Sequence, residues 1–273
     1  MRAMRISMMW ALTLASGAAC LAQPIPEMRP YSTPTTQAAQ APSMASPAQP
    51  PAPRLAEAVI GLQIKYVRDS AEYSTLMAQT YRVAADAVGR AKQALPTSAT
   101  WAVVLDIDET VLDNSVYQLE RATYGIGFDS GSWSAWVERA QAPAVPGVSD
   151  FLAAMRLAGG RVAFITNRAE AMRVATIRNL ASVGVWREGD LLCLKQPSAG
   201  SSKAARRAEL RDGKGQCAWP GKPARVLAYL GDQIGDFPAV GEEPGTSWAE
   251  AFGLRYFLLP NPMYGDWTSQ VTR

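Results

Sequence analysis

The stretch that decides the fold is WAVVL (101–105), followed at once by DIDET (106–110). The first five residues are all apolar, which is typical of a strand buried on both faces of a parallel sheet. The next five place two carboxylates, Asp106 and Asp108, directly after that strand. Because ligands bind at the carboxyl ends of parallel strands, we expect both carboxylates to face the active site. One could attack a phosphorus atom, and the other could act as general acid and base.

Further along the chain, short apolar runs alternate with helical patterns. The expected strands are Arg161–Ile165, Leu191–Leu194, Val226–Leu230 and Arg255–Leu259. The expected helices between them are Val148–Leu157, Glu170–Val183 and Ser202–Leu210. Such alternation predicts an α/β fold with a doubly wound parallel sheet.

Two segments do not follow this alternation. Residues 55–95 contain no proline and should form a helical N-terminal extension of one or two helices, ending near Pro96. Residues 115–146 mix aromatic residues with glycine and serine. We interpret them as a helical cap insertion that arches over the strand ends and excludes water.

The N-terminus predicts export. Residues 1–22 combine two arginines, an apolar run and small residues, as a signal peptide does. Cys20 lies where a lipoprotein signal would be processed, but Gly17 replaces the leucine usual in such signals, and cleavage after Ala19 or Ala22 is an open alternative. We therefore expect a periplasmic protein or an outer-membrane lipoprotein.

The following segment, 23–54, holds nine of the chain's 19 prolines and little apolar surface, so we expect a disordered linker ahead of a folded domain at 55–273. Cys193 and Cys217 could form a disulfide in an oxidising compartment or remain two separate buried thiols.

Composition excludes several classes of enzyme. The chain has no histidine, so Ser-His-Asp hydrolases, Cys-His proteases, histidine phosphatases and most zinc hydrolases are ruled out. The net charge of +3 falls to about +1 if the two N-terminal arginines are removed with the signal. This balance gives no reason to expect a nucleic-acid polymer as partner, and membrane contact would come only through a lipid at Cys20.

Three further groups of polar residues follow later expected strands or begin a helix. Thr166 and Asn167 follow the second strand and could bind phosphate oxygens through a hydroxyl and backbone N–H groups. Lys203 begins a helix and could neutralise a phosphoryl group. Asp232 and Asp236 follow the fourth strand in GDQIGDF (231–237). Each taken singly has a structural alternative: a helix cap, a solvated lysine or a turn.

The carboxylates also predict a metal site. A hard oxygen site for Mg²⁺ would be formed by the side chains of Asp106 and Asp232 together with the backbone carbonyl of Asp108, and Asp236 would lie close by. A calcium-binding loop does not fit, because its sixth position would be Val111 rather than glycine.

Three segments resemble one family. VVLDIDETVLDNSVYQ (103–118), GDQIGDF (231–237) and PNPMYGDW (260–267) are similar to the class C nonspecific acid phosphatases of the haloacid-dehalogenase superfamily, which include outer-membrane lipoprotein 5′-nucleotidases. The resemblance covers about residues 55–267. The chain departs from the family at Gln233-Ile234, where Asn-Leu is usual.

This resemblance implies a haloacid-dehalogenase-like Rossmannoid core, a Mg²⁺ cofactor and an aspartyl-phosphate intermediate on Asp106, with Asp108 as acid and base. Thr166 and Lys203 would bind phosphate, and nucleoside 5′-monophosphates or other small phosphomonoesters would be substrates. Aromatic residues would stack on the leaving group; the candidates are Tyr117, Trp133, Trp136 and Tyr264. A phosphotransferase using the same intermediate and a non-catalytic surface binding protein on the same fold are the alternatives.

Overall fold

The computed structural model describes residues 60–243 and 247–269. The expected signal peptide (1–22) with Cys20 and the expected linker (23–54) lie outside the described residues. Among these described residues, five parallel strands form one sheet in the order β3-β2-β1-β4-β5. The strands are β1 (Trp101–Leu105), β2 (Arg161–Ala169), β3 (Leu191–Lys195), β4 (Arg225–Gly231) and β5 (Tyr256–Leu258). Every strand predicted from the apolar runs is present, and the parallel α/β fold is confirmed.

The helices also lie where the sequence places them. The long ones on the sheet are α2 (Ala71–Gln93), α5 (Val148–Leu157), α6 (Arg173–Ser182) and α7 (Ala204–Asp212). The other elements in the described part of the chain are α1 (Leu62–Asp69), α3 (Ser115–Thr123), α4 (Ser130–Arg139), α8 (Trp248–Ala251) and three 3₁₀ turns at Glu170–Met172, Ile234–Asp236 and Asp266–Ser269. The N-terminal extension is two helices because Ser70 ends α1 and caps α2, its hydroxyl accepting from the Tyr73 amide at 3.0 Å.

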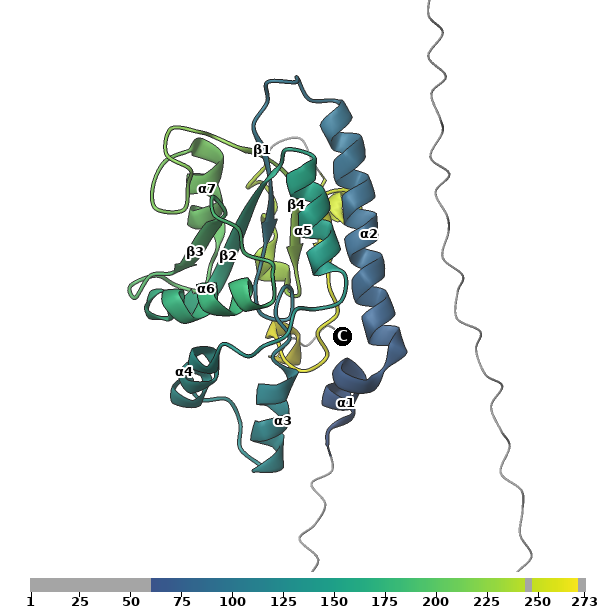
Figure 1. Cartoon of the computed structure of the whole chain (residues 1–273), viewed down its shortest axis with the longest axis vertical. Helices are drawn as coiled ribbons and strands as arrows, with labels where there is room; N and C mark the ends of the chain where they lie inside the picture. The colour runs from purple at the N-terminus through teal and green to yellow at the C-terminus, as the bar shows by residue number, and fades with distance from the viewer. Residues whose placement is uncertain (1–59, 244–246, 270–273) are drawn as a thin grey trace, which may run out of the picture. The chain divides into compact units, whose positions relative to one another are not determined.

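Alternation along β1 divides the core between the two faces of the sheet. Val103 and Leu105 belong to a buried cluster with residues of α2, α5 and α6, whereas Ala102 and Val104 belong to a second cluster with residues of α7 and α8. All five residues of β1 are buried, as expected for the central strand of a sheet covered on both faces. Figure 1 shows α2 and α5 lying together along one face.

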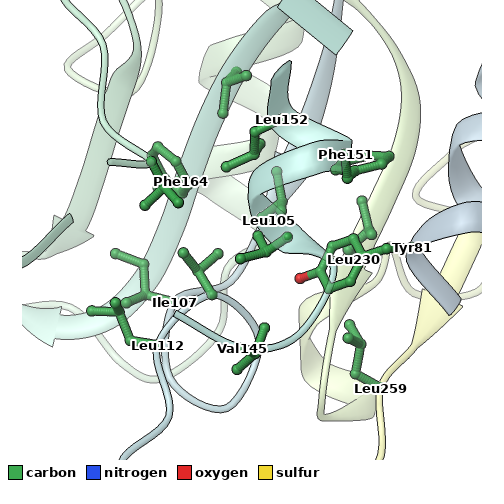
Figure 2. Close-up of a cluster of buried hydrophobic side chains, with 14 of the residues drawn as sticks. Tyr81, Leu105, Ile107, Leu112, Val145, Phe151, Leu152, Phe164, Leu230 and Leu259 are labelled. Atoms are coloured by element: carbon green, nitrogen blue, oxygen red, sulfur yellow. The ribbon is translucent and has the colours of Figure 1, made fainter. Parts of the chain in front are cut away.

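The first cluster extends to the end of β1, where the site lies. Figure 2 shows Leu105 and Ile107 packed with Leu112, Val145 and Leu230, and Tyr81 beside Phe151. This packing encloses the loop after β1 on its inner side. The polar groups of that loop are therefore fixed relative to the sheet.

The segment 115–146 carries helices α3 and α4, and Figure 1 shows both beyond the carboxyl ends of the strands. Its return to the core is tied by Asn179 of α6, which exchanges two hydrogen bonds with the Ala142 backbone at 3.1 and 2.8 Å. The cap is thus joined to the core by buried hydrogen bonds.

Cys193 and Cys217 form a disulfide, with their Cα atoms 5.2 Å apart, which resolves the alternative left open by the sequence. It links β3 to the loop after α7. Within the described residues, no helix is both long and apolar enough to cross a lipid bilayer.

Candidate active site

The site begins in the tight loop after β1. The Asp106 amide donates to the Leu230 carbonyl at 3.0 Å, so Asp106 stays in register with the sheet. The chain then turns back around the Ile107 carbonyl, which accepts from the amides of Val111 and Leu112 at 2.8 and 2.9 Å. Glu109 adopts a left-handed φ of 56° within this turn. Such a loop holds the Asp106 and Asp108 side chains at the end of the sheet.

Three carboxylates meet at this edge. One oxygen each of Asp106, Asp232 and Asp236 lies within 4.8 Å of the others. The ammonium of Lys203, at the start of α7, donates to Asp106 and, at 2.6 Å, to Asp236. Asp232 instead accepts from the Asn261 amide at 2.8 Å. This geometry agrees with the prediction from the sequence that the three aspartates and Lys203 would lie at one edge of the sheet.

The cluster has an excess of negative charge. Burial, opposed by Lys203 and reinforced by Asp236 and Asp108, raises the pKa of Asp106 to about 7. Burial and the carboxylates of Asp236 and Asp106 likewise raise the pKa of Asp232 well above its ordinary range. Lys203 is buried, which would lower its pKa, but the two carboxylates that it contacts raise it, so the ammonium stays charged.

A divalent cation fits this donor set. The oxygens are hard ligands, they converge within one coordination sphere, and a single lysine does not neutralise three aspartates. Asp108 does not belong to this cluster through its side chain. Its expected contribution to the metal site was its backbone carbonyl.

The Asp108 side chain makes an ion pair with Arg168, at 2.7 Å between Oδ1 and Nη2, and accepts from Asn114 at 2.9 Å. The sequence prediction used only the hydroxyl and backbone of this segment and missed the guanidinium. The sequence did contain a signal for this ion pair, because Arg168 lies at the end of β2, the strand beside β1.

Strand β2 runs to Ala169, four residues beyond the predicted end. Its pairing with β3 is interrupted after Ile165 and resumes at Ala169, so Thr166 and Asn167 lie in an irregular stretch of strand rather than after it. The Asn167 side chain accepts from Arg206 at 2.6 Å and donates to the Ser201 carbonyl at 3.0 Å. These bonds join the end of β2 to α7 and to the turn before it.

A cavity of about 1010 Å³ opens above these groups. Its polar side includes Asp106, Asp108, Thr166, Asn167 and Lys203. Its apolar side is formed by side chains from the cap and from the loops after β4 and β5; they are Phe128, Trp133, Ile234, Phe237, Val240, Trp248 and Tyr264.

Two of the four aromatic residues expected to contact a substrate do not reach this cavity. Tyr117 and Trp136 are each only 2% exposed, because both pack inside the cap. Tyr117 meets the edge of Trp133 and bonds Ser132 at 3.0 Å, and the indole of Trp136 donates to Asn114 at 2.8 Å. Trp133 and Tyr264 do line the cavity.

Comparison with known proteins agrees with this geometry. Residues 38–267 match the family described as haloacid-dehalogenase superfamily, subfamily IIIB (acid phosphatase). The class C acid phosphatase of Bacillus anthracis has a similar structure, with a TM-score of 0.64 and 29% identity over 76% of this chain and 85% of that one. A second structure of that phosphatase, with tungstate bound, gives a TM-score of 0.63 and 30% identity over the same shares.

Plant proteins are related over a shorter stretch. Acid phosphatase 1 of Solanum lycopersicum is 28% identical over 162 residues, 59% of this chain and 57% of that protein. The stem 31 kDa glycoprotein of Glycine max is 31% identical over 170 residues, 59% of this chain and 58% of that protein. The chain thus matches less than two thirds of the length of these plant relatives. With the family match covering most of its length, the chain belongs to the acid phosphatase family, subfamily IIIB of the haloacid-dehalogenase superfamily.

Proposed function

We propose that this protein is an exported, Mg²⁺-dependent acid phosphatase that hydrolyses phosphomonoesters, with nucleoside 5′-monophosphates among its substrates. The observation that carries the proposal is the placement of two carboxylates with different partners on one cavity. Asp106 contacts a buried lysine and lies within 4.8 Å of two other carboxylates, whereas Asp108 contacts an arginine. Two carboxylates in unlike surroundings can serve as nucleophile and as acid and base.

In the proposed reaction, an Asp106 carboxylate oxygen attacks phosphorus and the bond from phosphorus to the ester oxygen breaks. Asp108 gives its proton to that oxygen, so the leaving group departs as an alcohol. Asp108 then takes a proton from water, whose oxygen attacks the phosphorus of the aspartyl phosphate. Phosphate leaves, and both carboxylates return to their starting states. Lys203 and Thr166 would bind the phosphoryl oxygens.

Asp106, Asp232, Asp236 and the Asp108 carbonyl would hold Mg²⁺. When bound, the ion supplies positive charge that offsets the charge of the phosphoryl group and of the crowded carboxylates. Magnesium suits this all-oxygen set because it prefers carboxylates and keeps several waters as ligands.

The aromatic lining of the cavity favours substrates with a bulky leaving group. Trp133 of α4 and Tyr264 after β5 present aromatic surface beside the polar side of the cavity. A nucleobase or an aryl group would gain stacking and burial there. We therefore propose nucleoside monophosphates and aryl phosphates as substrates in preference to small alkyl phosphates.

Export is supported by the disulfide between Cys193 and Cys217, since disulfides persist in oxidising compartments. It accords with the signal-like composition of residues 1–22. Lipidation at Cys20 remains a prediction from the sequence.

Phosphate release from nucleoside monophosphates and an aryl phosphate, measured from pH 5 to 8 with and without Mg²⁺, tests the proposal. We expect Mg²⁺-dependent release that is lost in Asp106→Asn. An added alcohol acceptor distinguishes hydrolysis from phosphotransfer. A folded wild-type protein that releases no phosphate under any of these conditions would point to a non-catalytic binding protein instead.

A further inference from the structure

The two oxygens of the Asp108 carboxylate have very different surroundings. Oδ1 accepts three N–H bonds: from Arg168 Nε at 3.0 Å, from Arg168 Nη2 at 2.7 Å and from Asn114 Nδ2 at 2.9 Å. Oδ2 has only a longer contact with Arg168 Nε, at 3.3 Å. Asp108 lines the cavity and its side chain is 19% exposed. A proton on this carboxyl group therefore belongs on Oδ2, because three donors already surround Oδ1.

The groups that hold Oδ1 are buried and are supported by the cap. Asn114 is fully buried, and its own oxygen accepts from the Trp136 indole at 2.8 Å. The Arg168 side chain is 1% exposed, and its guanidinium carbon lies 5.7 Å from the centre of the Trp133 ring. Both tryptophans belong to α4. One helix of the cap thus braces both donors to Asp108.

The guanidinium of Arg168 has a further partner in the core. The guanidinium also reaches Thr176 of α6 at 3.3 Å, so Arg168 is held on the side away from Asp108 as well. Arg168 and Asn114 are themselves buried, so the loss of a partner would leave a buried polar group unpaired. The orientation of Asp108 is accordingly fixed by side chains from the core and from the cap together.

We propose that Arg168 and Asn114, braced by α4, are positioning residues that direct Oδ2 of Asp108 at the leaving-group oxygen. This inference rests on the proposed function. As the Asp106–phosphorus bond forms and the phosphorus–ester oxygen bond breaks, the proton moves from Oδ2 to the ester oxygen. The carboxylate left behind keeps its three N–H donors on Oδ1, which stabilise the new negative charge. In the second half of the reaction, Oδ2 takes the proton back from the attacking water.

The proposal makes a prediction about leaving groups. An alkoxide is a poor leaving group and needs the proton, whereas dinitrophenolate departs without one. Loss of correct orientation at Asp108 should therefore slow hydrolysis of alkyl phosphates and largely spare 2,4-dinitrophenyl phosphate. A general loss of structure, or loss of a phosphate-binding group, would affect both substrates alike.

The experiment compares kcat/KM for adenosine 5′-monophosphate, whose leaving oxygen is an alcohol, and for 2,4-dinitrophenyl phosphate at saturating Mg²⁺. For Arg168→Met we expect a fall of about 100-fold or more with the alkyl ester and less than about 5-fold with the dinitrophenyl ester. Trp136→Phe keeps an aromatic ring but removes the N–H that holds Asn114. It should show the same selective loss, of about 10-fold.

Arg156→Met is the matched control, because Arg156 makes a similar two-bond ion pair with Asp190, at 3.3 and 2.6 Å, and neither residue lines the cavity. It should lower the melting temperature and leave the ratio of the two kcat/KM values unchanged. If Arg168→Met does not fold, Trp136→Phe decides. If the folded variants keep the wild-type ratio of the two kcat/KM values, whether or not both values fall, the positioning role is overturned. A wild type that hydrolyses neither ester would instead overturn the proposed function.

Discussion

Replacing Asp232 by Asn should make the metal-free protein more stable. Asp232 lies within 4.8 Å of Asp106 and Asp236, and among the described residues no lysine or arginine forms an ion pair with it. At 4.8 Å and an effective dielectric constant of about 20, two like charges repel by about 3.5 kcal/mol. The amide would lose one hydrogen bond, with Asn261 or Thr110, which costs about 1 kcal/mol. We therefore expect a net gain of about 2.5 kcal/mol.

The stability difference between Asp232→Asn and wild type should depend on pH. Burial and the neighbouring carboxylates raise the pKa of Asp232 well above its ordinary value of 3.8, so the folded protein binds this proton more tightly than the unfolded chain does. The contribution of Asp232 to stability consequently falls as the pH rises above 3.8. Because asparagine does not ionise, Asp232→Asn avoids that loss, and its advantage should grow from acidic toward neutral pH.

Thermal melts with a chelator and with Mg²⁺ provide the assay. Without metal, the melting temperature of Asp232→Asn should exceed that of wild type by roughly 5–10 °C at neutral pH. With Mg²⁺ at one hundred times its Kd, wild type should gain about 2.7 kcal/mol and the variant far less. Asp236→Asn is the control: it relieves the same repulsion but also removes a partner of Lys203, so it should stabilise the metal-free protein less than Asp232→Asn does. An Asp232→Asn protein that is less stable than wild type in chelator, and that responds to Mg²⁺ as wild type does, would show that Asp232 is not repelled by its neighbours and does not hold the metal.

Two other predictions concern parts of the fold that support the site. Glu242→Gln breaks a partly buried two-bond ion pair with Arg207, at 2.9 and 2.7 Å, and should cost about 2 kcal/mol at pH 7. Although burial raises the pKa of Glu242, its bonds to Arg207 outweigh this and lower it below 4.5, so in urea titrations the difference should be full above pH 4.5 and shrink below it. A pH-independent difference would contradict the ion-pair explanation. Reduction of the Cys193–Cys217 bond, which spans 24 positions, should cost about 3.5 kcal/mol, whereas a double alanine variant should melt at the same temperature with and without reductant. An identical melting temperature for oxidised and reduced wild type would show that the bond does not stabilise the domain.

The sheet and the carboxylates were predictable because both depend on local patterns. WAVVL (101–105) forms β1 with the predicted bounds, and Val148–Leu157 forms α5 with the predicted bounds. Parallel strands bring their carboxyl ends together, so Asp106, Lys203 and Asp232 could be expected at one edge from sequence order alone.

The partners of Asp108 could not be predicted in this way. Arg168 and Asn114 reach it only because β2 continues as an irregular strand and because α4 packs against both residues. Tyr117 and Trp136, which were expected to contact the substrate, lie inside the cap instead. An aromatic residue in a cap can face the cavity or the interior of the cap, and the spacing of aromatic residues along the chain does not distinguish the two.

Trapping the phosphorylated enzyme tests the role of Asp106 most directly. Protein quenched during turnover of a good substrate is treated with borohydride, which reduces an acyl phosphate to an alcohol and so converts a phosphorylated aspartate to homoserine. Peptide mass spectrometry should then find homoserine at position 106, only when substrate is present and never in Asp106→Asn. Homoserine at another aspartate, or none at all in a sample that is turning over, would contradict a covalent intermediate on Asp106.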